Sequence, residues 1–256
     1  MGRSLPKRTH KIGPHSDQRA SENDAGQSPN WMEPAYADLL RSDPMMAGPL
    51  ADLLRYPFTN TALSDKERHL ILIAVYSSAT TNNVAGLRHQ IALARAAGAC
   101  DAEIIEVLEL ASVIGIHTAS TGMPILLEEM RAADPDFKPK LSPEQQAIKE
   151  DFIAKRNWWS DFLEAMVLLD AEFLAVYTEF SSVPAKRGTF SLRFRELVFI
   201  AIDCQTTHLY TDGLRSHIRN ALKAGAKTSE IIAVFTLLSR LGLTSIPTGL
   251  SMLGKS

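Results

Sequence analysis

Two stretches of sequence decide the fold: residues 86–110, GLRHQIALARAAGACDAEIIEVLEL, and residues 213–237, GLRSHIRNALKAGAKTSEIIAVFTL. They lie within a longer internal repeat, in which residues 63–127 align with residues 190–254 at a constant offset of 127 and without a gap. In this alignment 24 of 65 pairs are identical, whereas unrelated sequences would give roughly four. We therefore expect two copies of one structural unit, called here the first and the second copy.

Each copy predicts three successive helices. Ser64 followed by Glu67 matches a capping box, which predicts a helix start just before the apolar run 70–75. The second helix is expected to begin near residues 84–85 or 211–212 and to end at an Ala-Gly-Ala triplet. Gly98 and Gly225 in these triplets suit C-terminal caps.

The third helix is expected to begin at Asp101 in the first copy and at Thr228 in the second. In the second copy it has a wide apolar stripe at helical spacing, which predicts burial on more than one side. The stripe consists of Ile231, Ile232, Val234, Phe235, Leu237, Leu238 and Leu241.

The segments outside the repeat have different compositions. Residues 1–30 are almost free of apolar side chains and are predicted to be disordered. Short apolar groups separated by prolines 44, 49 and 57 predict two brief helices before the first copy. Residues 134–139 form a turn-rich linker, Ser142 and Pro143 mark a helix start, and residues 144–180 are expected to form one or two long helices.

These patterns predict an all-α protein with a tandem-repeat organisation. Residues 197–202 are short and rich in β-branched or aromatic residues, so periodicity alone leaves them ambiguous between helix and strand. The expected division is a disordered arm (1–30), a degenerate first repeat domain (31–133), a linker (134–143) and a second repeat domain (144–256).

Composition limits the classes of partner. The formal net charge is −2, and no Lys/Arg block beyond a mild N-terminal cluster favours nucleic acid or an anionic membrane. The longest apolar runs fall short of the ~20 residues that span a bilayer. We expect a cytoplasmic protein with a small-molecule or protein partner. Cys100 and Cys204 occupy non-equivalent repeat positions, which predicts neither a disulfide nor a thiolate metal site.

His217 is the first candidate functional residue. Leu214, His217, Ile218 and Ala221 fall on one face of the second helix of the second copy, so the imidazole belongs to an apolar stripe. A histidine there either packs in the core with a hydrogen-bond partner or lines a pocket. The pattern alone leaves both interpretations open.

The neighbours of His217 give it functional interest. Arg215, Asp212, His208 and the adjacent Asp203 and Cys204 lie on the same helix, in the loop before it or at the end of the preceding helix. An imidazole beside a guanidinium could transfer a proton while the arginine holds a carboxylate. The hypothesis is a site for an acidic or enolisable substrate, with His208, Asp212 and Cys204 as further lining residues.

Glu196 can have a structural role, and the spacing of the histidines gives only weak support for a metal site. Glu196 lies near the start of its helix, where an acid can stabilise the helix dipole as readily as serve catalysis. His208, Asp212 and His217 could in principle ligate a metal, but their spacing is a weak signal and no HExxH motif occurs. We therefore expect no metal and no cofactor.

The first copy differs at these polar positions. Gln90 aligns with His217, and His69 aligns with Glu196. His89 is one position away from the aligned site, so it lies about 100° around the helix axis and cannot replace His217. Arg88, the counterpart of Arg215, can hold a structural ion pair as readily as a ligand. The first copy is therefore predicted to be structural or to form a differently shaped wall.

The second copy resembles the carboxymuconolactone decarboxylase family, whose relatives include the AhpD-like alkylhydroperoxidases. The resemblance rests on the segment 195–201 (RELVFIA), on His217 with Gly225 eight residues later, on residues 230–232 (EII) and on the Gly242…Gly249 segment. It implies an all-α AhpD-like fold that assembles as homo-oligomers. For a tandem chain, a trimer with a six-unit ring is expected.

The resemblance also suggests roles for residues. His217 corresponds to the family's helix histidine, and Glu196 to the acid of its R-E-L motif. The peroxidase branch has Cys-x-x-Cys just before that histidine, but this chain has Tyr210 and Gly213 there. The decarboxylase branch commonly has an acid two positions before the histidine, where this chain has Arg215. These departures argue against alkylhydroperoxidase activity and put the original lactone substrate in doubt.

The leading hypothesis is a cofactor-independent lyase or isomerase, similar to carboxymuconolactone decarboxylase, that acts on a small carboxylated lactone or keto acid. In this hypothesis His217 transfers the proton, Glu196 orients His217 or relays protons, and Arg215 anchors the carboxylate. The alternatives are a non-catalytic or ligand-binding oligomeric scaffold, and a thiol-dependent peroxidase that uses Cys204.

Overall fold

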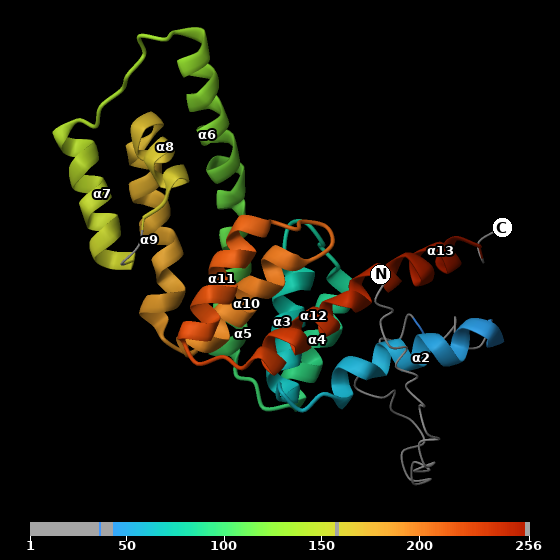
Figure 1. Cartoon of the computed structure of the whole chain (residues 1–256). Helices are drawn as coiled ribbons and strands as arrows, with labels where there is room; N and C mark the ends of the chain where they lie inside the picture. Colours follow the sequence, from blue (N-terminus) through green and yellow to red (C-terminus); the bar gives the residue numbers. More distant parts are fainter. Residues whose placement is uncertain (1–35, 37–42, 157–158, 254–256) are drawn as a thin grey trace, which may run out of the picture.

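The computed structural model describes residue 36 and residues 43–156 and 159–253. These residues form helices and connecting loops, without a strand among them, which confirms the predicted all-α class (Figure 1). Residues 197–202, the ambiguous run, lie inside a helix. The predicted disordered arm, 1–30, lies outside the described residues.

The helices fall into two matching series with an insertion between them. The first series comprises α2 (Pro44–Thr59), α3 (Asp65–Ser77), α4 (Val84–Ala96), α5 (Asp101–Ser112), the 3-10 turn η2 (Val113–Gly115) and α6 (Ile116–Ala133). The insertion comprises α7 (Pro143–Arg156) and α8 (Asp161–Leu169). The second series comprises α9 (Ala171–Arg187), α10 (Leu192–Cys204), α11 (Thr211–Lys223), α12 (Thr228–Leu238), η3 (Ser239–Thr244) and α13 (Ser245–Leu253).

Local signals place the helix ends of both copies. Ser64 caps α3 through a complete capping box with Glu67, as predicted. Gly98 and Gly225 follow the C-caps of α4 and α11 with φ of +87° and +89°, a backbone conformation that favours glycine. The predicted starts of α4, α5, α11 and α12 are confirmed.

The structural repeat extends further toward the N-terminus than the aligned sequence. Helix α2 begins at Pro44 and α9 at Ala171, which keeps the offset of 127. Asp43 caps α2 and Asp170, at the same offset, caps α9, each with a side-chain oxygen that accepts backbone N–H hydrogen bonds. The unit is therefore a helix series that starts with α2 or α9, and α9 belongs to the second copy.

Some expected helix boundaries were wrong. Pro49 and Pro57 lie inside α2, so the 44–59 segment is one helix and the prolines do not end it. The apolar side chains of Leu50 and Leu54, buried between the prolines, favour the continuous helix despite the missing backbone donors. Residues 144–180 form parts of three helices rather than one or two, with a break before α8 and another at Asp170.

The two copies share one hydrophobic core. Helices α3 and α10 lie at its centre, and residues 70–76 and 197–202 are almost completely buried, except Phe199, which is partly buried. Where the copies meet, the Gln205 side chain accepts hydrogen bonds from Ser78 Oγ at 3.1 Å and Thr81 Oγ1 at 2.7 Å. Gln205 and Ser78 are equivalent repeat positions, so the copies face each other across a pseudo-twofold axis.

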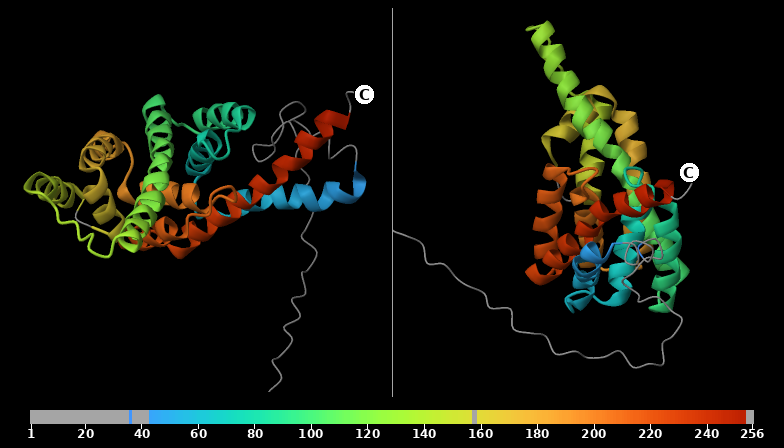
Figure 2. Two further views of the ribbon diagram at one scale, coloured as in Figure 1. Left: turned by 90° about the horizontal axis from the view of Figure 1, so that it is seen from above. Right: turned by 90° about the vertical axis from the view of Figure 1, so that its right-hand side faces the viewer.

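Two extensions leave this core at opposite ends (Figures 1 and 2). At one end α6 packs on α8, and residues of α7 and α9 complete a second apolar cluster around Met166 and Val167. At the other end α2 and α13 run together, where Leu50 and Leu54 pack with Leu243 and Ile246. Helix α6 therefore belongs to the first copy but packs against the insertion, chiefly against α8.

The apolar stripe of α12 is buried less completely than predicted. Ile231, Val234 and Leu237 are buried, but Ile232 is 50% exposed and Phe235 is 38% exposed. The reason is that α12 packs on α10 and α2 and presents its remaining side to the surface of the single chain.

Among the described residues, one helical stretch, Asp101–Ala133, meets the length and composition required to cross a membrane.

Arg193 connects the two copies by charge. It donates hydrogen bonds to Glu230 in its own copy and to Glu67 in the first copy. The equivalent lysine, Lys66, contacts only Glu103, at 2.7 Å. Burial by itself raises the pKa of Glu67, but hydrogen bonds from Ser64 and Arg193 outweigh it and hold the pKa below its ordinary value of 4.5.

We predict that Arg193→Ala lowers the free energy of unfolding by about 1–3 kcal/mol, because two half-buried carboxylates lose their shared partner. The matched change, Lys66→Ala, should cost less than about 1 kcal/mol, since it breaks a single ion pair that is more exposed than those of Arg193. Urea denaturation at pH 7 measures both.

The contribution of Glu67 should be complete above pH 4.5 and lost as the pH falls through its lower folded-state pKa. Equal losses for the two variants at pH 7 would contradict a special role for Arg193.

Candidate functional site

Glu196 and His217 form a hydrogen-bonded pair between adjacent helices. Glu196 lies in the first half of α10 and is buried, and its Oε2 lies 2.7 Å from Nδ1 of His217 on α11. The imidazole stacks on Phe199, with ring centroids 4.7 Å apart, and its side chain is 26% exposed. When Nδ1–H donates to the carboxylate, Nε2 is the nitrogen left to accept or release a proton.

The first copy contains a mirror of this pair with the residue types exchanged. His69 on α3 occupies the position of Glu196, Gln90 on α4 occupies that of His217, and His69 Nδ1 lies 2.7 Å from the Gln90 amide oxygen. Both side chains are about 1% exposed. Burial lowers the pKa of His69, and an amide cannot take up a proton at neutral pH. The first pair therefore acts as a structural hydrogen bond.

Asp203 faces the free nitrogen of His217. It lies near the end of α10, is 2% exposed, and its Oδ2 atom is 3.9 Å from His217 Nε2. Oδ2 is buried and has no hydrogen-bond partner. Burial raises the pKa of Asp203 to about 7, although the charge of His217 acts in the opposite direction. A proton-accepting group at neutral pH thus lies beside the imidazole.

A glycine makes room for this carboxylate. A Cβ atom at Gly213 would lie 2.2 Å from Asp203 Oδ2 and 2.6 Å from the ring of Tyr210. The equivalent Gly86 lies under the ring of Tyr76, which replaces Asp203 in the first copy. Both copies therefore need the glycine for close approach of a side chain, and only the second places a carboxylate there.

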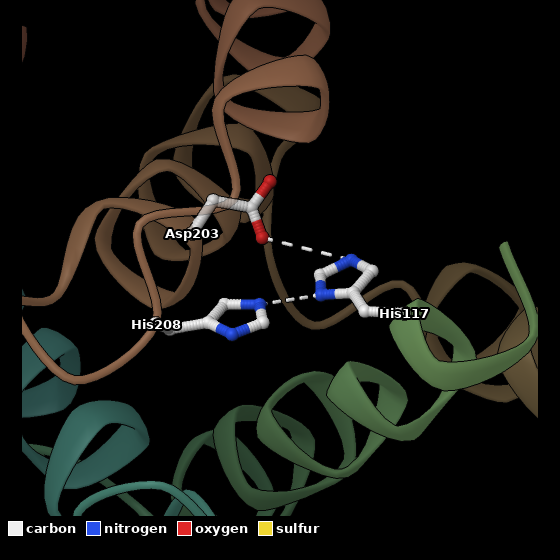
Figure 3. A group of neighbouring side chains, drawn as sticks. All are labelled: His117, Asp203 and His208. Carbon is white, nitrogen blue, oxygen red and sulfur yellow. Dashed lines mark hydrogen bonds and ion pairs between the residues drawn. The ribbon is translucent and has the colours of Figure 1, made fainter. Parts of the chain in front are cut away.

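A second imidazole reaches Asp203 from the first copy (Figure 3). His117, near the start of α6, has its Nε2 3.7 Å from Asp203 Oδ1 and its Nδ1 2.6 Å from Nε2 of His208. Tyr210 stacks on His117 at 4.0 Å between ring centroids. Burial and the neighbouring histidines lower the pKa of His117 to about 4, and burial lowers that of His208. Both imidazoles are therefore neutral at pH 7.

The resulting cluster differs from the set expected from sequence. Glu196, His217 and His208 all line it, as expected. Asp203 and His117 join it, although the sequence named Asp203 only as a neighbour of His217 and assigned no role to His117. The donor atoms of His117, Asp203 and His208 lie within 4.8 Å of one another, so these three could hold a metal ion.

Arg215 and Asp212 are not brought into the cluster. Both side chains are exposed. Arg215 is two residues before His217, which places it about 200° around the helix axis, on the opposite side of α11. The single chain therefore does not show the cationic neighbour that the sequence suggested for His217.

Cys204 packs against the shared core rather than lining an open site. Burial raises the pKa of its thiol to about 12, and the charge of Asp203 acts in the same direction. A thiol in this setting is a poor nucleophile at neutral pH. Cys100 is exposed, so the two cysteines differ in access.

Two surface hollows, of about 350 and 330 Å³, lie away from His217. The larger is lined by Ser77 of α3, Leu108 and Ala111 of α5, and Ile114 and Gly115 of η2. The smaller lies between α6 and α8. Neither has Glu196 or His217 in its wall, and the His217 side chain is 26% exposed at the surface of the single chain.

We predict that Gly213→Ala destabilises the protein by about 1–3 kcal/mol, because the new methyl group overlaps Asp203 and Tyr210. Gly115→Ala is the control, since a Cβ there meets nothing within 4 Å. Thermal unfolding of both variants tests this. An unchanged Tm for Gly213→Ala would show that Asp203 does not lie against α11.

We predict that a disulfide reagent such as Ellman's reagent modifies one thiol per native chain rapidly at pH 8 and both after unfolding. The fast thiol is Cys100, because Cys204 is protected by burial and its raised pKa. Cys100→Ser should abolish the fast phase and Cys204→Ser should leave it. Rapid labelling of the Cys100→Ser variant would contradict the description of Cys204.

Comparisons with known proteins agree with this architecture. The model of the carboxymuconolactone decarboxylase family matches residues 171–243. No curated protein matches the chain. A crystal structure of a candidate gamma-carboxymuconolactone decarboxylase subunit from Burkholderia xenovorans LB400 is 34% identical, with a TM-score of 0.82. That similarity covers 87% of this chain and 90% of the other.

Proposed function

This chain belongs to the carboxymuconolactone decarboxylase family, and we propose that it is a lyase or isomerase that acts on a small carboxylated lactone or keto acid by acid–base catalysis. The observation that supports the proposal best is the Glu196–His217 hydrogen bond of 2.7 Å, at an imidazole that is 26% exposed and whose other nitrogen lies 3.9 Å from Asp203. The name of the similar Burkholderia protein makes gamma-carboxymuconolactone the first substrate to test.

In the proposed decarboxylation, the bond between the carboxylate carbon and the adjacent ring carbon breaks. Carbon dioxide leaves, and the electron pair stays on the ring carbon as an enolate. Nε2–H of the His217 imidazolium then donates its proton to that carbon, which leaves a neutral imidazole. Solvent returns the proton for the next cycle. An isomerisation would use the same nitrogen to remove a proton from one carbon and return it to another.

Glu196 is the positioning residue in this scheme. Its carboxylate accepts the Nδ1–H hydrogen bond, which fixes the ring orientation and stabilises the imidazolium by charge. The stacking of Phe199 on the ring restricts its rotation further. In the first copy, Gln90 and His69 reproduce the hydrogen bond without the charge and without exposure. The proposed activity therefore belongs to the second copy.

The carboxylate anchor is not assigned to Arg215, because its side chain points away from His217 in the single chain. Tyr210 and Ser120, joined by a hydrogen bond of 3.1 Å, are uncharged donors beside His117 in the cluster. Cys204 supports no peroxidase proposal, because it is half-buried, its pKa is raised and Cys-x-x-Cys is missing.

We predict that His217→Ala lowers carbon dioxide release from gamma-carboxymuconolactone at least about 100-fold, because proton transfer loses its acid. Glu196→Gln should lower kcat by about tenfold or more while keeping the fold, since the amide still accepts the Nδ1–H hydrogen bond but provides no charge. His69→Gln is the matched control and should retain wild-type kcat.

Equal rates for wild type and His217→Ala would contradict the proposal. A second candidate, a ligand-binding scaffold without catalysis, is favoured by the absence of Glu196 and His217 from the walls of both described hollows. It predicts no turnover of any lactone acid by wild type, with saturable binding of the same acids in calorimetry.

A further inference from the structure

We propose that His117, His208 and Asp203 bind one divalent transition-metal ion, of the zinc or cobalt type, next to His217. The three side chains come from three separate segments: α6 of the first copy, the loop after α10, and the end of α10 itself (Figure 3). Each offers one donor atom, and these atoms lie within 4.8 Å of one another. The proposal departs from the sequence-based expectation of no metal and stands independently of the acid–base chemistry.

The donor set has the chemistry of a transition-metal site. Two imidazole nitrogens and one carboxylate oxygen form a common ligand set for zinc and for non-haem iron. A divalent alkaline-earth ion is disfavoured, since calcium and magnesium prefer oxygen ligands. The three ligands leave at least one coordination position for water or a ligand, because His117 and His208 are only partly buried.

The spacing of the donors fits an ion after small adjustments. Bonds of about 2.0–2.2 Å around a tetrahedral ion separate neighbouring donor atoms by roughly 3.3–3.5 Å. The His117–His208 nitrogens are 2.6 Å apart, and His117 Nε2 lies 3.7 Å from Asp203 Oδ1. One distance is shorter than required and the other longer. These two distances involve different nitrogens of His117, and an ion takes only one, so the three donors of a single set lie within 4.8 Å of one another and must move closer together to bind the ion.

The buried carboxylate provides a second, independent observation. Asp203 is 2% exposed, and its Oδ2 atom has no hydrogen-bond partner. A buried carboxylate without a partner is costly unless a cation or a donor compensates it. No lysine or arginine contacts it among the described residues; its ion-pair partners there are the imidazoles of His117 and His217. A metal ion at the three donors would provide the missing positive charge.

The surrounding residues hold the donors in place. Tyr210 stacks on the ring of His117 and hydrogen-bonds to Ser120 at 3.1 Å. Gly213 leaves the space that Asp203 occupies. The counterparts of Asp203 and His208 in the first copy are Tyr76 and Thr81, and the counterpart of His117 in the second copy is Thr244, so the repeat supplies no comparable ligand set. Among the described residues, the proposed site therefore occurs once, beside the Glu196–His217 pair and not beside its structural counterpart.

The experiment is a titration of tag-free, full-length protein with Co²⁺, followed by visible d–d absorption. We expect one Co²⁺ per chain and displacement by Zn²⁺. His117→Ala, His208→Ala and Asp203→Asn should each weaken binding at least about tenfold. The matched controls are His89→Ala and Asp212→Asn, which remove a histidine and an acid outside the cluster and should bind as wild type does.

Circular dichroism checks that each variant is folded, and the effect of Zn²⁺ on the Tm of wild type gives a second measurement. Bound Zn²⁺ should raise the Tm of wild type, and the rise should be smaller in His117→Ala, His208→Ala and Asp203→Asn. A wild-type protein without a d–d band and without a Zn²⁺-dependent Tm would overturn the proposal, as would unchanged binding in His117→Ala. His217→Ala should still bind Co²⁺, so loss of activity in that variant is distinguishable from loss of metal.

Discussion

The packing of α3 against α10 across the pseudo-twofold axis is the constraint on which the rest of the structure depends. These two helices are buried on nearly all sides, and Gln205 ties their C-terminal ends together through Ser78 and Thr81. Each central helix then presents the same positions to its own second helix. Because the backbone of these helices is duplicated, the difference between the two histidine pairs comes from their side chains.

The two pairs illustrate how a repeated fold can separate stability from chemistry. In both copies, an imidazole shares a hydrogen bond of 2.7 Å with an oxygen on the neighbouring helix. In the first copy the pair is neutral and sealed. In the second, a carboxylate replaces the amide oxygen, the imidazole moves to the outer helix, and Asp203 takes the place of a tyrosine. His117 then arrives from the first copy, so the candidate site requires the whole chain.

Much of the fold could be predicted from the sequence, because the repeat duplicates strong local signals such as the capping box at Ser64 and the glycines at 98 and 225. The site was predicted less completely. Glu196 and His217 were identified, and the exchange of residue types at positions 69/196 and 90/217 was the signal that could have paired them. His117 could not be placed, since only the path of α6 across the copies brings it to Asp203. Arg215 and Asp212 were close in sequence but face solvent.

The central claim is that His217, and not the structural pair of His69 and Gln90 in the first copy, interacts chemically with a small carboxylated ligand. Histidine-ring ¹H–¹⁵N NMR spectra, recorded while a lactone acid is added, test this claim most directly. We predict saturable shifts of the His217 ring nitrogens, with those of His69 unchanged. Movement of His69 with His217 unaffected, or no movement of either while the ligand binds, would contradict it.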